Sequence, residues 1–98
     1  MMTKEEIKNK ILANKEVLES YKVKSISLFG SFVRNEQKEG SDIDFLVEFT
    51  SDTYDNFIHL IFALEDLFKR NVQVVTKDDL SPYIQPYVMK EVEKIEGW

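Results

Sequence analysis

The chain has 98 residues and a formal net charge of −5, with 43% hydrophobic and 32% charged residues. This length suits one small soluble domain, residues 1–98, with one core. The acidic balance argues against broad electrostatic binding of nucleic acid, which needs clustered Lys and Arg, so no direct nucleic-acid binding is expected. The absence of cysteine excludes disulfides and thiolate metal sites. Without a membrane-spanning apolar run or a signal-peptide core, we expect a cytoplasmic protein with no membrane partner.

The first half of the chain combines helical spacing with two strand patterns. Residues 3–6 form a capping box, and apolar residues then recur at helical spacing up to Tyr21. Residues 25–29 are predicted to form a first strand and residues 31–36 a short helix. Residues 43–49 are predicted to form a second strand.

The second half begins with the strongest amphipathic pattern of the chain. Ser51 and Asp52 are expected to cap a long helix, whose apolar residues follow an i, i+3, i+4, i+7 pattern up to Phe68. The β-branched residues 72–76 predict a third strand. A last helix is expected to begin at Pro86, because proline suits a first helical position. This helix would present three apolar residues: Val88, Val92 and Ile95. Strands that alternate with helices predict an α/β fold in which helices cover a small sheet.

The most informative motif is Gly30-Ser31 followed, after ten residues, by Asp42-Ile43-Asp44. Gly30, at the end of an apolar strand, would let the backbone approach a ligand closely. Ser31 would cap the short helix, whose first N–H groups attract phosphate. The strand period of two places the carboxylates of Asp42 and Asp44 on one face. Carboxylates paired in this way suit Mg²⁺, which is usually bound by one or two carboxylates plus substrate phosphates.

This motif, a strand followed by Gly-Ser, ten residues and Asp-x-Asp, resembles the pattern of the polymerase-beta nucleotidyltransferase superfamily. The small size of the chain is similar to that of the minimal nucleotidyltransferase branch of this superfamily. The resemblance extends from about Val23 to residues 78–83. It implies a mixed β-sheet flanked by helices, with the active site at one end of the first two strands. It also implies transfer of a nucleoside monophosphate, expected to be AMP from ATP, to an acceptor hydroxyl.

The resemblance also assigns roles to the motif residues. Asp42 and Asp44 would be catalytic and would hold one or two Mg²⁺ ions. Gly30, Ser31 and Arg34 would bind the nucleotide. Arg34 lies one helical turn after Ser31, where the family often has arginine followed by glycine, but Asn35 follows here. A phosphate contact and a structural ion pair with a nearby carboxylate are equally compatible with Arg34.

One position departs from the family pattern. In the superfamily a third carboxylate comes from the strand after the long helix, and the matching residue here is Gln73. An amide offers a metal one oxygen but carries no charge and takes up no proton. Glu48 shares the predicted face of Asp44 but lies about 13 Å along the strand, too far for the same metals. Asp78 and Asp79 lie beyond the third strand and would approach only through an unusual loop. The sequence therefore predicts an intact nucleotide and metal site with one degenerate catalytic position.

Two functional hypotheses follow. By resemblance, the acceptor is expected to be a tyrosine of a HEPN-type toxin, with this chain as its antitoxin and a nucleoside triphosphate as substrate. The alternative is a catalytically impaired binding module that neutralises or scaffolds a partner protein without transfer. Gln73 favours the alternative, and the intact Gly-Ser and Asp-x-Asp motif opposes it. An antibiotic-modifying nucleotidyltransferase is disfavoured, because those enzymes usually carry extra chain for the acceptor pocket. The single histidine, His59, is expected to be solvated.

Overall fold

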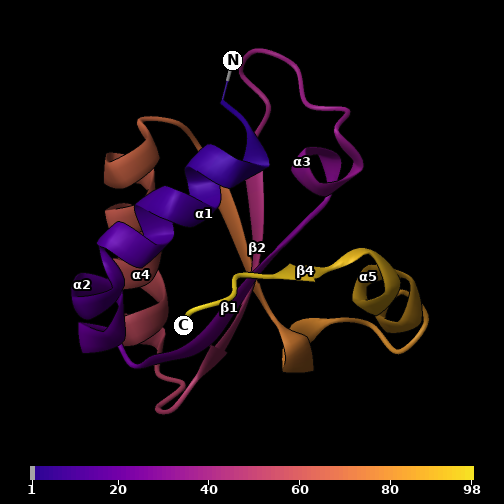
Figure 1. The fold of residues 1–98 in the computed structure, drawn as a ribbon. Coiled ribbons are helices and arrows are strands. Elements are labelled where there is room, and N and C mark those ends of the chain that lie inside the picture. The colour runs from indigo at the N-terminus through magenta and orange to yellow at the C-terminus, as the bar shows by residue number, and fades with distance from the viewer. Residues whose placement is uncertain (1) are drawn as a thin grey trace.

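The protein contains a four-stranded β-sheet with helices on both faces, and the computed structural model describes residues 2–98 (Figure 1). In chain order the elements are α1 (Lys4–Ala13), α2 (Lys15–Ser20), β1 (Val23–Phe29), α3 (Ser31–Arg34), β2 (Ile43–Phe49), α4 (Tyr54–Phe68), β3 (Val72–Thr76), the 3-10 helix η1 (Lys77–Asp79), α5 (Gln85–Glu91) and β4 (Glu93–Lys94). The strand order is β3-β2-β1-β4. β2 and β3 are parallel, whereas β1 is antiparallel to both β2 and β4. The predicted fold class, a small mixed sheet flanked by helices, is confirmed.

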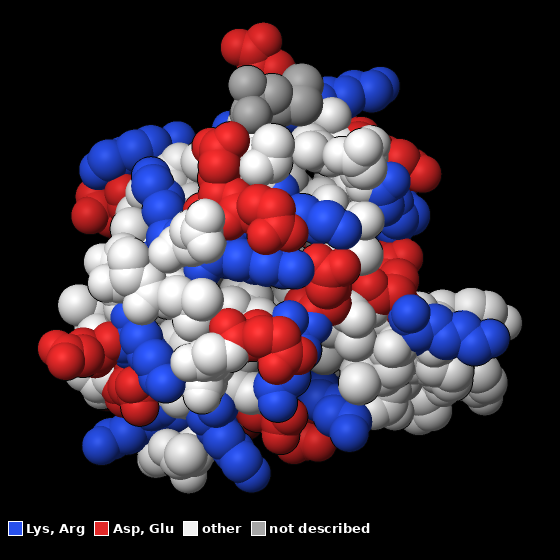
Figure 2. Space-filling view, in the orientation of Figure 1, with Lys and Arg blue, Asp and Glu red and all other residues white. Residues whose placement is uncertain are grey.

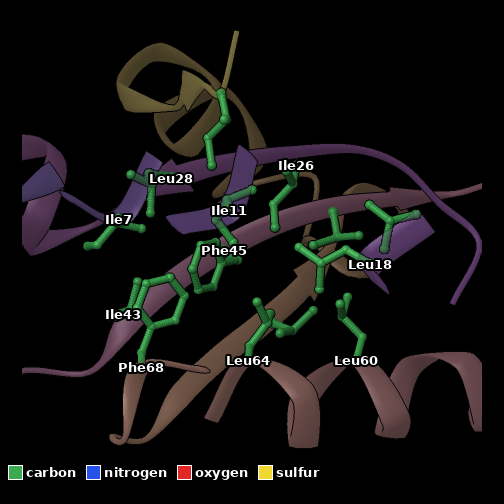
Figure 3. Packing of buried hydrophobic residues seen from close by; sticks show 14 of the residues in the cluster. Ile7, Ile11, Leu18, Ile26, Leu28, Ile43, Phe45, Leu60, Leu64 and Phe68 are labelled. Carbon is green, nitrogen blue, oxygen red and sulfur yellow. The ribbon is translucent and has the colours of Figure 1, made fainter. Parts of the chain in front are cut away.

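One face of the sheet packs against α1, α2 and α4 to form the core (Figure 3). Ile43, Phe45 and Val47 of β2 all point into this core, because every second side chain of a strand lies on the same face. The three helices supply buried residues at helical spacing: Ile7, Ile11, Leu18, Leu60, Leu64 and Phe68. Full burial stabilises the fold by roughly 1.5–3 kcal/mol for each such side chain. The same alternation turns Asp44 toward the opposite face of the sheet.

The N-terminal segment is two helices rather than the single helix expected up to Tyr21. Its start is as predicted, because the Thr3 hydroxyl accepts a hydrogen bond from the backbone N–H of Glu6 at 3.3 Å. The division falls at Asn14, whose side-chain amide donates to the carbonyl oxygen of Lys10 at 2.8 Å. In a continuous helix that carbonyl would accept the backbone N–H of Asn14, so the side chain competes with the helix. The chain consequently turns between α1 and α2.

The long helix α4 begins with a different cap from the one predicted. The cap is Thr53, whose hydroxyl accepts from the backbone N–H of Asn56 at 3.2 Å, and not Ser51 or Asp52. Thr53 directly precedes the first helical residue in extended conformation, which is the geometry that a side-chain cap requires. The helix then ends at a left-handed Lys69 (φ 54°).

The C-terminal segment differs most from the sequence prediction. Pro86 is the second residue of α5 rather than the first, and the helix ends before Val92. The chain then extends into β4, which pairs with β1 through Lys94 opposite Ser27. Ile95 is fully buried in the core instead of lying on a helix face. Among the described residues, no helix is long and apolar enough to cross a membrane.

Candidate functional site

The site is built around Asp44, on the sheet face opposite the main core. Asp44 of β2 pairs with Phe29 at the end of β1 and with Gln73 near the start of β3. Directly paired residues on neighbouring strands place their side chains on the same face. Asp44 is half-buried, whereas Gln73 is exposed. The strand register therefore brings Gln73, the predicted third-carboxylate position, beside Asp44.

Gly30 follows β1 at a point where only glycine fits. Its backbone has φ 81° and ψ −151°, a region that is essentially restricted to glycine. A Cβ atom at Gly30 would lie 2.2 Å from Oδ2 of Asp44. The sequence predicted a close approach of the Gly30 backbone to a ligand, and in the structure the group that lies against this backbone is the Asp44 carboxylate.

Asp42 lies one residue before β2, at the same end of the sheet, and is exposed. Burial raises the pKa of the Asp44 carboxyl, the negative charge of Asp42 raises this pKa further, and the Arg34 guanidinium opposes both. The chain entering Asp42 is anchored by Arg70, which donates from Nη1 to the Ser41 carbonyl oxygen at 3.2 Å. The two carboxylates therefore repel each other across a partly desolvated site, and a cation placed beside them would relieve the repulsion.

Ser31 and Asn35 delimit the short helix α3. Ser31 is its first residue, and Gly30 holds the capping position, so the prediction that the Ser31 side chain caps the helix is wrong. Asn35 ends the helix in the left-handed conformation, with φ 58° and ψ 35°. Asparagine adopts this conformation more readily than other non-glycine residues. Asn35 therefore meets the same backbone requirement as the glycine that the family pattern has there.

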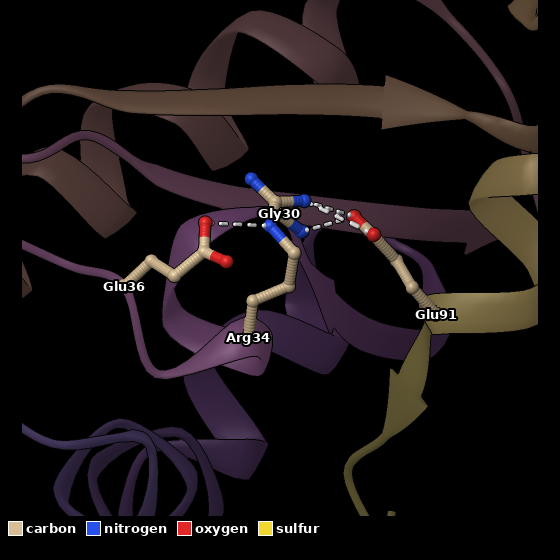
Figure 4. A network of polar contacts seen from close by, with 4 residues as sticks. All are labelled: Gly30, Arg34, Glu36 and Glu91. Atoms are coloured by element: carbon tan, nitrogen blue, oxygen red, sulfur yellow. Dashed lines mark hydrogen bonds and ion pairs between the residues drawn. The ribbon is translucent and has the colours of Figure 1, made fainter.

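Arg34 forms an ion-pair network that includes a residue not predicted from the sequence (Figure 4). Its Nη1 donates to Oε1 and Oε2 of Glu91 at 2.9 and 3.0 Å, and its Nε donates to Oε2 of Glu36 at 3.1 Å. Glu91 Oε1 also accepts the backbone N–H of Gly30 at 2.9 Å. Two roles were considered for Arg34, a phosphate contact and a structural ion pair, and the structure shows the ion pair.

The other carboxylates considered for the site lie elsewhere. Glu48 is exposed further along β2, where it accepts from the Ser25 hydroxyl at 3.2 Å. Asp78 and Asp79 follow the far end of β3, and Asp79 accepts a hydrogen bond from Thr76 at 2.6 Å. In residues 2–98 no group of three or more histidine or acidic side chains is arranged to hold a metal ion. The candidate metal ligands are the two aspartates of the motif, Asp42 and Asp44, and Mg²⁺ usually takes one or two carboxylates from a protein.

A family model described as a nucleotidyltransferase domain matches residues 10–95. The chain belongs to this family. A Thermococcus cleftensis relative named protein adenylyltransferase MntA is 42% identical, and the match covers 94% of this chain and 95% of the relative. A Methanocaldococcus jannaschii relative, provisionally named a protein adenylyltransferase, is 43% identical, with coverage of 96% and 95%.

Solved structures agree with this assignment. One, described provisionally as a minimal nucleotidyltransferase, superposes with a TM-score of 0.79 at 29% identity and covers 93% of this chain and 94% of its own. A toxin–antitoxin crystal structure with AMP-PNP has a TM-score of 0.73 at 24% identity, covering 93% of this chain and 73% of its own, which shows a shared fold. These matches confirm the resemblance to the minimal nucleotidyltransferase branch.

Within this minimal nucleotidyltransferase, Glu91 is the site residue that sequence reasoning missed. It lies 61 positions after Gly30 and outside the Gly-Ser and Asp-x-Asp motif. A lone glutamate near a helix end carries no pattern of its own. Only the position of α5 in the folded chain brings Glu91 to Gly30 and Arg34. His59, by contrast, is exposed on α4 as expected, with its ring centroid 6.1 Å from that of Tyr21.

Proposed function

We propose that this nucleotidyltransferase moves AMP from ATP to a hydroxyl group of a protein acceptor. The observation that carries the proposal is the convergence of Gly30, Asp42 and Asp44 at one end of the sheet face opposite the main core. The relatives of more than 40% identity that are named protein adenylyltransferases support both the nucleotide and the protein acceptor. The step forms a bond between the acceptor oxygen and the α-phosphorus, and pyrophosphate leaves with the electron pair of the broken bond.

Asp42 and Asp44 would hold Mg²⁺ in this reaction. The fit rests on their chemistry, because both donors are carboxylates and one is half-buried beside the charge of the other. When bound, the ion neutralises the triphosphate and stabilises the in-line displacement. The protein fixes Asp44 between β1 and β3 and anchors the approach to Asp42 through Arg70. The acceptor proton must pass to a carboxylate or to water, because Gln73 accepts none.

Gly30, Ser31 and Arg34 would bind the outer phosphates. Gly30 offers its backbone N–H, and Arg34 offers a guanidinium suited to phosphate oxygens. Gly30 lies against the Asp44 carboxylate and the Arg34 charge acts on Asp44, so a triphosphate on these groups would reach the two aspartates. Ser31, the first residue of α3, is partly exposed on the same turn.

We infer further that the acceptor belongs to a HEPN-type toxin and that this chain is its antitoxin. Structures of the same fold include a tri-AMPylated Shewanella oneidensis HEPN toxin in complex with an MNT antitoxin, with a TM-score of 0.64 at 19% identity, covering 93% of this chain and 73% of its own. On the present chain, α5 and the segment before it expose large apolar residues: Tyr83, Ile84, Tyr87 and Met89. The lobe at the right of Figure 2, where Figure 1 places α5, is mostly white, whereas charged side chains of both signs are scattered over the remainder of that view. An apolar surface beside the site suits a protein acceptor better than a small molecule.

Mass spectrometry of the partner tests transfer directly. The product of the neighbouring gene is incubated with the protein, ATP and Mg²⁺, preferably where that product is a small helical protein with an Arg-x-x-x-x-His motif. We expect a covalent AMP adduct on a tyrosine, and no adduct with the Asp42→Asn/Asp44→Asn variant. A stable complex without any adduct would instead support the binding-module function, which the uncharged Gln73 beside Asp44 favours. If neither an AMP adduct nor a stable complex forms over a range of salt concentrations, both the transferase and the binding-module functions are contradicted.

A further inference from the structure

Glu91 occupies the hydrogen-bonding groups that are proposed to bind a nucleotide phosphate. Its Oε1 accepts the backbone N–H of Gly30, and both carboxylate oxygens accept from Nη1 of Arg34, with the three distances between 2.9 and 3.0 Å. Figure 4 shows the side chain reaching from α5 to these two groups. A carboxylate and a phosphate present similar negatively charged oxygens to N–H donors. The site therefore already holds an anion, supplied by the protein itself.

We propose that Glu91 is a resident competitor of the triphosphate, and that nucleotide binding displaces it from Gly30 and Arg34. This inference rests on the proposed function of the Gly30 turn. One backbone N–H makes one good hydrogen bond, so Gly30 cannot serve Glu91 and a phosphate oxygen equally. A phosphate bound at Gly30 would also lie against the Glu91 carboxylate, and like charges in a partly desolvated site repel.

The position of Glu91 at the end of α5 links this competition to the apolar surface. In α5, all of whose residues are described, none is buried. Among the described residues, the side-chain hydrogen bonds from α5 to the remainder of the chain are those of Glu91 with Gly30 and Arg34. Loss of these bonds would leave α5 held mainly through β4, which follows it. Nucleotide binding would thus loosen the helix that carries Tyr87 and Met89.

Competition is tested with inorganic tripolyphosphate in the absence of metal, measured by calorimetry. Glu91→Gln keeps an acceptor oxygen for Gly30 but removes the charge. We expect it to bind tripolyphosphate at least about fivefold more tightly than the wild type, the lower end of typical coupling between two ligands. Glu36→Gln is the matched control, because Glu36 also pairs with Arg34, whereas the Gly30 N–H donates to Glu91. We expect a clearly smaller change for this control.

Three outcomes would overturn the inference. Unchanged or weaker binding by Glu91→Gln would mean that Glu91 supports the phosphate site instead of competing for it. Equal gains in both variants would reduce the effect to net charge. Absence of tripolyphosphate binding in all three proteins would remove the anion site. If the tripolyphosphate affinities change as expected but no AMP is transferred, the proposed function is contradicted, whereas competition between Glu91 and phosphate is still supported.

Hydrogen exchange tests the displacement separately. In the wild-type protein, tripolyphosphate should speed amide exchange in residues 85–91, because Glu91 then releases the end of α5. In Glu91→Gln, exchange in this segment should be faster without ligand and should change less when ligand is added. Slower exchange of this helix in the wild type on ligand addition would contradict release.

Discussion

Gly30 satisfies two independent demands, a backbone conformation restricted to glycine and contact with the Asp44 carboxylate. Gly40 offers a natural comparison. Its φ is also positive, at 84°, but no atom lies within 4 Å of the position that its Cβ would take. The two glycines therefore separate backbone strain from crowding at the site.

We predict that Gly30→Ala destabilises the protein more than Gly40→Ala does. Each change places alanine in an unfavourable backbone conformation, which costs roughly 1–3 kcal/mol. Only Gly30→Ala also forces the Asp44 carboxylate to move. Urea unfolding should show the larger loss for Gly30→Ala, and only this variant should lose affinity for Mg²⁺–ATP. If Gly30→Ala and Gly40→Ala lose equal stability and bind Mg²⁺–ATP equally well, the close contact between Gly30 and Asp44 is contradicted.

Asp44 is expected to cost the protein stability at neutral pH. Burial, followed by the charge of Asp42, raises the pKa of its carboxyl above the ordinary value of 3.8. Ionised Asp44 is therefore less favourable in the folded than in the unfolded chain, and folding stability improves as pH falls through the raised pKa. Asp44→Asn should raise the urea midpoint at neutral pH, and this advantage should shrink as pH falls toward the unfolded-state value. Asp42→Asn, which removes only the second cause, should raise the midpoint less. An advantage for Asp44→Asn that is independent of pH would contradict this electrostatic explanation.

The sequence predicts the long, regular elements and the short helix α3, but it does not predict β4 or the break between α1 and α2. β2 and β3 span the predicted residues 43–49 and 72–76, because β-branched and alternating residues identify strands of this length. β4 has only two residues, too few for any alternation to distinguish it from a continuing helix. The break at Asn14 depends on a side-chain hydrogen bond that local sequence patterns do not reveal.

For the candidate site too, local sequence patterns identify some residues but not those that are brought in by long-range contacts. Gly30 and the aspartates belong to one short motif and could be named from their spacing. The placement of Gln73 beside Asp44 needed strand register, which the family pattern supplied. The role of Glu91 depended on where the end of α5 lies in the folded chain, which no local sequence pattern fixes.

The shortest strand is attached to α1 by an ion-pair cluster. Glu93 of β4 contacts Nζ of both Lys8 and Lys4, and the bond from Lys8 is the main cause of its lowered pKa. A lowered pKa contributes stability that is present above the ordinary value of 4.5 and is lost as pH falls through the folded value. Glu93→Gln should therefore lower the unfolding free energy by up to about 1 kcal/mol at neutral pH, the upper range for exposed ion pairs. The loss should disappear in acid.

Asp66→Asn is the control for this pair. Asp66 pairs with Lys69, three residues later at the end of α4, so this exposed ion pair does not join two elements. Chemical denaturation over a pH series should show little change for this variant. A comparable loss in both variants would indicate that Glu93 does not fasten β4 to α1.

The chain combines a nucleotidyltransferase fold with one uncharged position, Gln73, beside Asp44. Gln73→Asp should restore a negative ligand and a proton acceptor on the same sheet face. We expect AMP transfer to rise by about 10²-fold or more, the scale of a general-base contribution. Transfer is measured by mass spectrometry of the partner over a time course. Asn9→Asp, on α1 at the opposite face, adds the same charge as a control and should leave the rate unchanged. A wild-type protein that transfers AMP rapidly, with Gln73→Asp no faster, would show that no third carboxylate is needed.

Calorimetric titration of Mg²⁺–ATP tests whether Asp42 and Asp44, beside Gly30, form a site for this ligand. The wild-type protein should bind, and Asp42→Asn/Asp44→Asn should lose binding while circular dichroism shows an unchanged fold. Glu48→Gln, further along the same strand, removes a carboxylate outside the site and should bind like the wild type. Equal affinity for Mg²⁺–ATP in the wild-type protein and the folded double variant would contradict the account.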